Sequence, residues 1–183
     1  MDNDVVRIQF GQATYHVNED AGSATIEVTL TTPSVNVVSV DYVASDGSAT
    51  NGSDYAATSG ALIFAPGETS QSFTVPILDD ALEEDNETVA LTLSNPQNGA
   101  LGTPAAAELV IMDDERVSVQ FDAPSYAVAE GDGSVDVDVV LSAPSALAVS
   151  VAFAVTGGTA KAGADYGPAA GTLIFAAGEA PKR

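Results

Sequence analysis

The residues most able to do chemistry in this sequence form a run of carboxylates that follows an alternating apolar segment. The run consists of Asp79, Asp80, Glu83, Glu84 and Asp85. At a separation of about 4 Å and an effective dielectric constant near 20, each pair of such charges repels by roughly 4 kcal/mol before screening by salt. Water and salt, protons or a hard divalent cation are the agents that lower this cost.

The elements that position these carboxylates follow from an internal repeat. Twelve residues of the first part of the chain recur 111 positions later, without a gap. The first set is Phe10, Tyr15, Glu19, Gly22, Leu30, Pro33, Asp54, Tyr55, Gly60, Phe64, Gly67 and Glu68. The matching set, in the same order, is Phe121, Tyr126, Glu130, Gly133, Leu141, Pro144, Asp165, Tyr166, Gly171, Phe175, Gly178 and Glu179. A fixed period of this kind indicates tandem copies of one structural unit. We therefore predict a complete repeat at residues 1–115 and a second, truncated repeat at residues 116–183.

Each repeat has the pattern of an all-β domain. Apolar and polar residues alternate over residues 23–30 and 37–42, the apolar-rich segments 61–64, 73–78, 89–93 and 108–112 complete the set, and Gly, Pro, Asn and Asp bound these segments. Such alternation is typical of strands with one buried face. With an opening strand at residues 7–17, split near Gly11, the first repeat has seven strands in about 110 residues. We predict a seven-stranded antiparallel Greek-key sandwich, followed by an incomplete second copy.

Strand direction predicts where the acids gather. Successive strands of such a sandwich mostly alternate in direction, so the first, third, fifth and seventh end at the same pole. These four strands end at Glu19-Asp20, at Asp46, at Asp79-Asp80 and at Asp113-Asp114-Glu115. Four acidic clusters that are remote in sequence are therefore expected at one end of the first repeat.

The chemistry that suits this end is binding of a hard cation. Ca²⁺ takes six to eight oxygen ligands from carboxylates, carbonyls and water, and turns at strand ends supply all three. A His or Cys cluster, which zinc or copper requires, is absent from the sequence. Mg²⁺ stays open, although it keeps more of its water and prefers fewer carboxylates. The loop spacing of an EF-hand is missing.

Composition excludes several other classes. The 26 acidic and 5 basic residues give a net charge of −21, which disfavours nucleic acid and anionic membrane surfaces as partners. The first repeat carries −18 of this charge and the second −3. The 45% hydrophobic content argues against a disordered acidic tail, and the sequence has no Cys for disulfides.

Four motifs in order resemble the Calx-beta domain family. They are Tyr15-x-x-x-Glu19-x-x-Gly22, Asp46-Gly-Ser-Ala-x-x-Gly-Ser-Asp54-Tyr55, Ile77-Leu-Asp-Asp-x-x-Glu83 and Ile111-Met-Asp-Asp-Glu115. The resemblance covers all of the first repeat and what is present of the second. It implies an immunoglobulin-like sandwich and Ca²⁺ as the ligand. The family includes regulatory domains of sodium–calcium exchangers and repeats of bacterial surface proteins.

The resemblance also implies a set of metal ligands. Carried over to this sequence, they are Glu19, Asp46, Asp79, Asp80, Glu83, Asp113, Asp114 and Glu115. The exchanger-type motif has a further acid where this chain has Ala81, which implies fewer ions or weaker binding. In the second repeat Gly157 replaces the counterpart of Asp46, and Glu130 and Asp132 remain. We expect no complete site there.

Other residues in the acidic regions have structural explanations. Asp54 and Asp165 are expected to bond backbone amides within turns. Tyr15 and Tyr55 are expected to be packed side chains, while Glu84, Asp85 and Glu87 are expected to be solvated. The single histidine, His16, is expected to face solvent. No G-x-S-x-G motif accompanies it, so we predict a binding module and not an enzyme.

Two alternatives to a calcium module remain from sequence. One is a metal-free spacer or adhesion module of a larger surface protein. The other is an accessory domain that binds a glycan or a protein, which the absence of Trp disfavours. Expected partners are calcium ions, neighbouring repeats of the same chain and other surface proteins. No signal peptide or membrane span is evident, and we expect an extracellular or cell-surface setting in a membrane-associated parent protein.

The second repeat stops at Arg183, the counterpart of Ser72, so its last three strands are absent from the sequence. Disorder, strand exchange in a dimer and a fragment boundary at Arg183 are the three explanations, and we favour the boundary. An incomplete sandwich exposes strand edges and an apolar face, which invites pairing with another chain.

Overall fold

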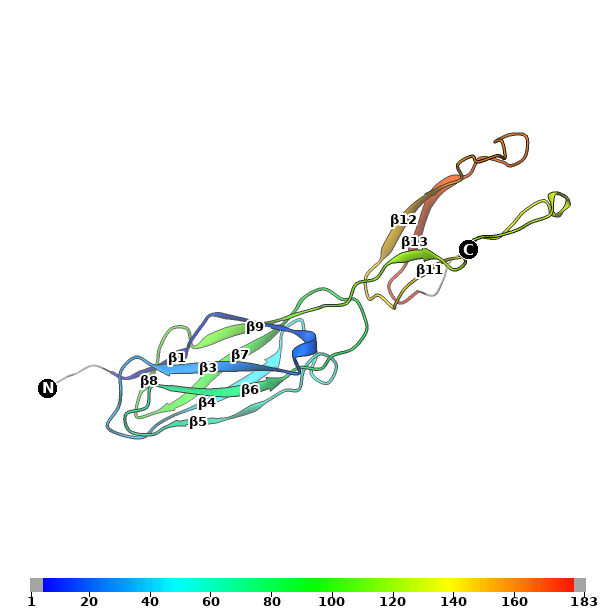
Figure 1. The fold of residues 1–183 in the computed structure, drawn as a ribbon. Helices are drawn as coiled ribbons and strands as arrows, with labels where there is room; N and C mark the ends of the chain where they lie inside the picture. Colours follow the sequence, from blue (N-terminus) through cyan, green and yellow to red (C-terminus); the bar gives the residue numbers. More distant parts are fainter. Residues whose placement is uncertain (1–4, 180–183) are drawn as a thin grey trace. The chain divides into compact units, whose positions relative to one another are not determined.

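The computed structural model describes residues 5–179, which form two compact units (Figure 1). The first unit contains residues 5–80 and 85–114, and the second contains residues 81–84 and 115–179. The short segment 81–84 therefore belongs to the second unit, although it comes from the acidic run of the first repeat. The only helices described are two three-residue 3₁₀ turns, and none is long enough to cross a bilayer.

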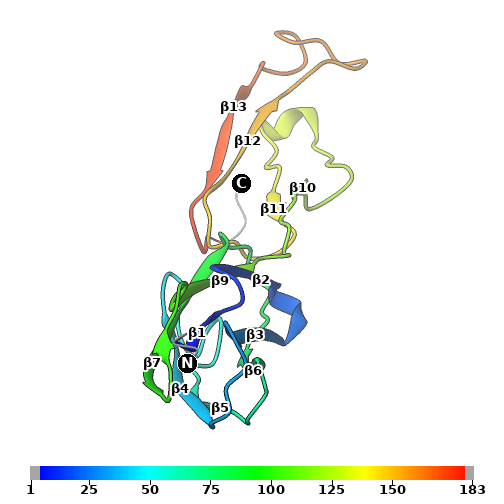
Figure 2. The same ribbon diagram turned by 90° about the vertical axis from the view of Figure 1, so that its left-hand side faces the viewer.

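The first unit is a sandwich of two sheets. One sheet has the order β6-β3-β1-β8, with strands β6 (Ser70–Pro76), β3 (Ser23–Leu30), β1 (Arg7–Phe10) and β8 (Ala100–Leu101). The other has the order β2-β9-β7-β4-β5, with strands β2 (Thr14–Asn18), β9 (Ala106–Met112), β7 (Glu87–Gln97), β4 (Val38–Asp46) and β5 (Ser59–Phe64). Figure 2 shows β3 and β6 on one side of this unit and β4 and β7 on the other. The predicted all-β sandwich is confirmed.

Two strand pairings differ from a purely antiparallel sandwich. The opening strand divides at residues 11–13: β1 joins the first sheet and β2 the second. β2 runs parallel to β9, and β1 runs parallel to the two-residue strand β8. The division of the opening strand near Gly11 agrees with the sequence, whereas the parallel pairs were not predicted.

The core lies between these two sheets. Alternate residues of each strand face inward, as the period of two requires. The inward side chains that are fully inaccessible to solvent include Ile8, Phe10, Ile26, Val28, Val38, Val40, Tyr55, Phe64, Val75, Val89 and Leu109. Tyr15 is also buried, and its hydroxyl donates to the carbonyl of Glu27 at 2.7 Å, while His16 is exposed. Both side chains lie as the alternation predicts.

The second unit has two separate strand pairs. β10 (Val119–Phe121) pairs with β11 (Val139–Leu141), and β12 (Val149–Ala154) pairs with β13 (Ala170–Phe175). The counterparts of β6 to β9 lie beyond the described residues or outside the sequence. Among the described residues of this unit, the apolar side chains with less than a tenth of their surface exposed are Val139 and Phe175. Its core is accordingly small.

Candidate metal centre

Strand registers bring the acidic strand ends together at one end of the first unit. Asn18 at the end of β2 lies beside Met112 at the end of β9, and Ser23 at the start of β3 lies opposite Pro76 at the end of β6. Asp46, the last residue of β4, lies opposite Val89 near the start of β7. The strands predicted to end at one pole are β2, β4, β6 and β9, and their common direction is confirmed.

Glu19 and Asp113 form the first carboxylate pair of this end. Glu19 opens a 3₁₀ turn (Glu19–Ala21) directly after β2, and Asp113 directly follows β9. Carboxylate oxygens of the two residues lie within 4.8 Å of each other. Glu19 is only 5% exposed. At an effective dielectric constant near 20, two negative charges at this separation repel by roughly 3.5 kcal/mol.

Asp79 and Asp114 form the second pair, also with carboxylate oxygens within 4.8 Å. Asp79 follows β6, which belongs to the sheet opposite that of β9. The two consecutive residues Asp113 and Asp114 therefore lie near different sheets: Asp113 is close to Glu19, which follows β2 of its own sheet, and Asp114 is close to Asp79, which follows β6 of the other.

Asp46 lies at the same end, but other groups hold its carboxylate. The same oxygen, Oδ1, accepts hydrogen bonds from the Tyr55 hydroxyl at 2.6 Å and the Asn51 amide at 2.9 Å. These bonds, that of Tyr55 foremost, lower the pKa of Asp46 below its ordinary value. The pKa of Tyr55 is raised, chiefly by burial and then by the bond to Asp46. The Tyr55 ring is buried, as predicted, and its hydroxyl holds the carboxylate of Asp46, a candidate metal ligand, in place.

Glu83 occupies a different environment from the other predicted ligands. It belongs to the second unit, where its amide donates to the carbonyl of Pro144 and its carbonyl accepts from the amide of Ala146 at 2.8 Å. Its carboxylate accepts a bond from the amide of Val117 at 3.4 Å. Sequence spacing placed Glu83 beside Asp79, whereas the structure assigns the two residues to different units.

The remaining predicted ligands differ in exposure. Asp80 is exposed and directly follows Asp79, and neither it nor Asp46 belongs to the carboxylate groups that the described residues bring within 4.8 Å. Glu115 is the first residue of the second unit after Asp114, and its Oε2 atom is inaccessible to solvent.

A third carboxylate pair was not proposed from sequence. Asp54 and Glu87 have oxygens within 4.8 Å of each other. Asp54 also accepts a bond from the amide of Thr50 at 2.6 Å, which is the turn role that the sequence predicted. Glu87 is the first residue of β7, so its proximity to Asp54 depends on the β4–β7 register rather than on any local motif.

The second unit retains part of this arrangement. Glu130 opens a 3₁₀ turn (Glu130–Asp132) that matches the turn at Glu19, and Asp165 accepts a bond from the amide of Lys161 as Asp54 does from Thr50. Glu130 is exposed. Among the residues that the structure describes, no group of three close carboxylates includes Glu130 or Asp132.

The fold and the gathered carboxylates define an immunoglobulin-like β-sandwich module with an acidic end. The family model described as the Calx-beta domain matches residues 2–115 and again residues 113–183. The chain belongs to the Calx-beta domain family.

Similar proteins include sodium–calcium exchangers. The chain is 33% identical over 200 residues to sodium/calcium exchanger 2 of Homo sapiens, a match that covers 99% of this chain and 22% of the exchanger. It is 29% identical over 182 residues to the sodium/calcium exchanger Calx of Drosophila melanogaster, covering 98% of this chain and 19% of that protein. The chain thus spans about a fifth of the length of these relatives.

Two solved structures show the same fold. The apo form of the Calx CBD1 domain superposes with a TM-score of 0.59 at 32% identity, covering 61% of this chain and all of that one. The calcium binding domain CBD12 of CALX1.1 superposes with a TM-score of 0.58 at 26% identity, covering 96% of this chain and 73% of that one.

Proposed function

We propose that the acidic end of the first unit binds Ca²⁺, and that the protein is a calcium-binding module and not an enzyme. The observation that carries the proposal is that the buried carboxylate of Glu19 lies within 4.8 Å of the carboxylate of Asp113. The next residue, Asp114, forms a second such pair with Asp79. A divalent cation offsets the repulsion of both pairs. The names of the similar proteins, a sodium/calcium exchanger and a calcium binding domain, support the same ligand.

The ligands divide into two groups by geometry. Glu19, Asp79, Asp113 and Asp114 form the pairs and are proposed as the principal ligands. Asp46, Asp80, Glu83 and Glu115 are proposed as further ligands on the basis of the family motif. Of these, Asp46 has one oxygen engaged by Tyr55 and Asn51, which leaves Oδ2 to coordinate a cation.

The proposed consequence of binding is local ordering. Asp79 starts the loop that leads to β7, and Asp113 and Asp114 are the last residues of the first unit before the second begins. A cation held by these residues restrains both segments. We propose that this restraint stabilises the first unit and stiffens the junction with the next repeat, in a larger protein that carries the module at a cell surface.

Calcium titration followed by thermal unfolding tests the proposal. At a free calcium concentration 100-fold above the dissociation constant, the first unit gains about 2.7 kcal/mol per site if the unfolded chain does not bind. The double variant Asp79→Asn, Asp113→Asn should lose this gain. Glu108→Gln serves as the matched control, because Glu108 is an exposed acid within β9 and away from both pairs.

The same double variant separates calcium binding from a metal-free spacer. In a spacer, removing the two charges relieves repulsion and stabilises the fold equally with and without calcium. That result, or an unchanged unfolding temperature of the unmodified protein at millimolar calcium, would overturn the proposal. Isothermal titration calorimetry on the whole chain gives the number of ions.

A further inference from the structure

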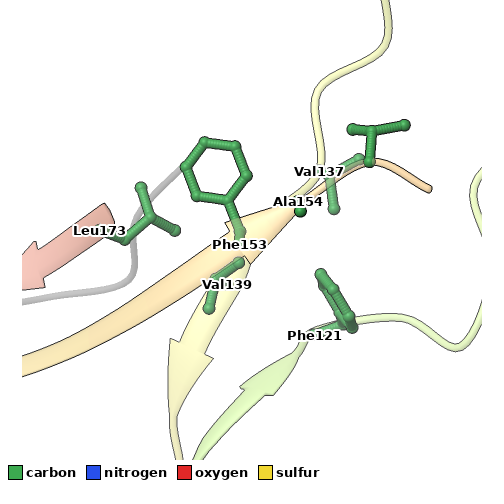
Figure 3. A pocket seen from close by; sticks show the side chains of 7 residues that line it. Phe121, Val137, Val139, Phe153, Ala154 and Leu173 are labelled. Atoms are coloured by element: carbon green, nitrogen blue, oxygen red, sulfur yellow. The ribbon is translucent and has the colours of Figure 1, made fainter. Parts of the chain in front are cut away.

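The apolar face of the second unit lacks part of its surroundings within the described residues. Phe121, Val139 and Phe153 line a pocket on this face (Figure 3), and the strands that would match β6 to β9 lie beyond the part of the chain that is described. The first unit, by contrast, is a two-sheet sandwich within the described residues. The contacts around its acidic end can therefore be followed residue by residue.

The loop after β4 is folded back onto the start of β7. This loop, residues 47–58, begins directly after the candidate ligand Asp46 and leads to β5. Its first residues contact Thr88, the second residue of β7. The Ala49 amide donates to the Thr88 carbonyl at 3.0 Å, and a Cβ atom at Gly47 would clash with the same carbonyl oxygen. The backbones of loop and strand are therefore in direct contact.

The side chains of Ser48 and Thr88 add a reciprocal pair of hydrogen bonds. The Ser48 amide donates to Thr88 Oγ1 at 3.2 Å, and the Thr88 amide donates to Ser48 Oγ at 2.9 Å. The two hydroxyl oxygens lie 3.3 Å apart, which is within hydrogen-bonding distance. Each side chain thus satisfies the backbone amide of the other residue, across 40 positions of sequence.

A pair of like charges acts against this attachment. Glu87 directly precedes Thr88, and its carboxylate lies within 4.8 Å of that of Asp54, which belongs to the loop. Two carboxylates at this separation repel each other. The repulsion pushes the loop away from the start of β7, and the hydrogen bonds to Thr88 oppose it.

The far part of the loop reaches the end of β6, which belongs to the opposite sheet. The Ala56 amide donates to the carbonyl of the last residue of β6 at 3.0 Å, and the Leu78 amide donates to the Asp54 carbonyl at 3.0 Å. Leu78 directly precedes Asp79, a proposed principal ligand. The loop therefore joins the start of β7 to the end of β6, with Asp46 before it and Asp79 beside it.

We infer that Thr88 is a positioning residue for the proposed calcium site and acts through the loop 47–58 on Asp46 and Asp79. The inference rests on the proposed function, because it concerns the ligands of that site. Thr88 is not a ligand itself, since Ser48 engages its hydroxyl. A loop that leaves β7 lowers the fraction of molecules ready to bind a cation, and the apparent affinity falls by the same factor.

Calcium titration calorimetry on the whole chain tests this inference, at a temperature well below unfolding. There, a change in stability alone leaves the dissociation constant unaltered. Thr88→Val keeps the branched shape of the side chain and removes its hydroxyl. It should weaken calcium binding about fivefold, the factor that one hydrogen bond of ordinary strength gives. Thr88→Ser retains a hydroxyl and should bind calcium as the unmodified protein does.

Thr92→Val is the matched control. Thr92 is exposed, lies four residues further along β7 and therefore on the same face, and is opposite Val43 of β4 rather than the loop. The same chemical change at this position should leave calcium binding unaltered. Equal weakening by Thr92→Val and Thr88→Val would overturn the inference, because any threonine hydroxyl of this strand would then suffice.

Ser48→Ala removes the same pair of bonds from the side of the loop. Ser48 is exposed, so this variant decides the question if Thr88→Val does not fold. It should weaken calcium binding to a similar degree, and the double variant should bind little more weakly than either single one, because the two side chains act together. In the presence of a calcium chelator, both single variants should show faster amide hydrogen exchange over residues 48–57.

The outcomes distinguish this inference from the proposed function. An absence of calcium binding by the unmodified protein would overturn both. Calcium binding that Thr88→Val and Ser48→Ala leave unchanged would overturn the inference alone, even if hydrogen exchange in the loop became faster. In that case Thr88 would only hold the loop, and the proposed function would stand.

Discussion

The two repeats carry the same pattern of residues, yet within the described residues the strands of the second repeat are fewer and mostly shorter than those of the first. β5 (Ser59–Phe64) and β13 (Ala170–Phe175) match residue for residue at the offset of 111. β3 spans Ser23–Leu30, whereas its counterpart β11 spans only Val139–Leu141. Residues 125–129, which match β2, form no strand. β12 (Val149–Ala154) is also shorter than its counterpart β4 (Val38–Asp46). The counterparts of β3, β2 and β4 have all shortened, and in the first unit these three strands pair with β6, β9 and β7, respectively.

Strand formation in this chain therefore depends on partners as much as on alternation. β5 has its partner β4 within the same part of the repeat, and β13 likewise has β12. Residues 134–138 alternate like residues 23–27, but within residues 5–179, which the structure describes, no strand lies beside them as β6 lies beside β3. A strand pair without a third strand or a covered face is marginal in water.

The largest expected difference concerns one phenylalanine of each repeat. Phe10→Ala removes a fully buried ring and should lower the free energy of unfolding of the first unit by about 3–5 kcal/mol. Phe121→Ala, at the matching position, should cost under about 1 kcal/mol because that ring is 63% exposed. Denaturant unfolding, with hydrogen exchange to resolve the two units, measures both. Equal losses would mean that the face of the second unit is covered in solution.

The next difference concerns the two glutamates that open the 3₁₀ turns. Glu19→Gln should reduce the calcium-dependent stabilisation of about 2.7 kcal/mol, because Glu19 is buried beside Asp113. Glu130→Gln should leave it unchanged, because Glu130 is exposed. Thermal unfolding with and without calcium compares the two variants. A loss with Glu130→Gln would place a cation in the second repeat.

A glycine pair gives a smaller difference. A Cβ atom at Gly47 would lie 2.4 Å from the carbonyl oxygen of Thr88, so Gly47→Ala should destabilise the first unit by about 1–3 kcal/mol. The matching Gly158 has no atom within 4 Å of such a Cβ. Gly158→Ala should be neutral or should stabilise by less than about 1 kcal/mol. Urea unfolding of the two variants checks this contrast, which a second strand beside β12 would abolish.

The smallest difference is a dependence on pH. Tyr55 lowers the pKa of Asp46 below its ordinary value of 3.8, so the folded first unit binds this proton more weakly than the unfolded chain. The bond therefore stabilises the unit above that pH, and the contribution is lost as the pH falls through the lower folded-state pKa. Tyr55→Phe should reduce stability near neutral pH and flatten its decline in acid.

Tyr166→Phe is the control for this effect. Tyr166 matches Tyr55, but Gly157 stands where the first repeat has Asp46. Removal of the Tyr166 hydroxyl should leave the acid dependence of stability unchanged. Unfolding curves between pH 2 and neutrality, recorded for both variants, measure the difference, and an identical response to the two changes would refute the role of the Tyr55–Asp46 bond.

Much of the first unit was predictable from alternation and strand direction. The ends of β2, β6 and β9 were placed at one pole by counting predicted strands, so Glu19, Asp79 and Asp113 could be assigned to one end. Strand partners could not be predicted in the same way. The parallel β2–β9 pair depends on the division of the opening strand between two sheets, and alternation carries no information about the direction of a neighbour.

The location of the candidate site could be predicted from the sequence, whereas the hydrogen bonds of its residues could not. The ligand set remains a prediction from the family motif. The bond from Tyr55 to Asp46 needs the turn at residues 50–55 to fold back on β4, which no local pattern specifies. The placement of Glu83 with residues 144–146 depends on a second copy of the fold and not on the acidic run itself.

The parallel pairing of β2 with β9 has a mechanical consequence. β2 is the second strand of the first unit and β9 is its last, and five residue pairs join them, from Thr14 beside Glu108 to Asn18 beside Met112. A pull on the two ends of the unit draws parallel strands past each other, so the load is shared by the whole row of hydrogen bonds. The unit then resists tension by shear, and a row of such repeats transmits force without opening at its first bond.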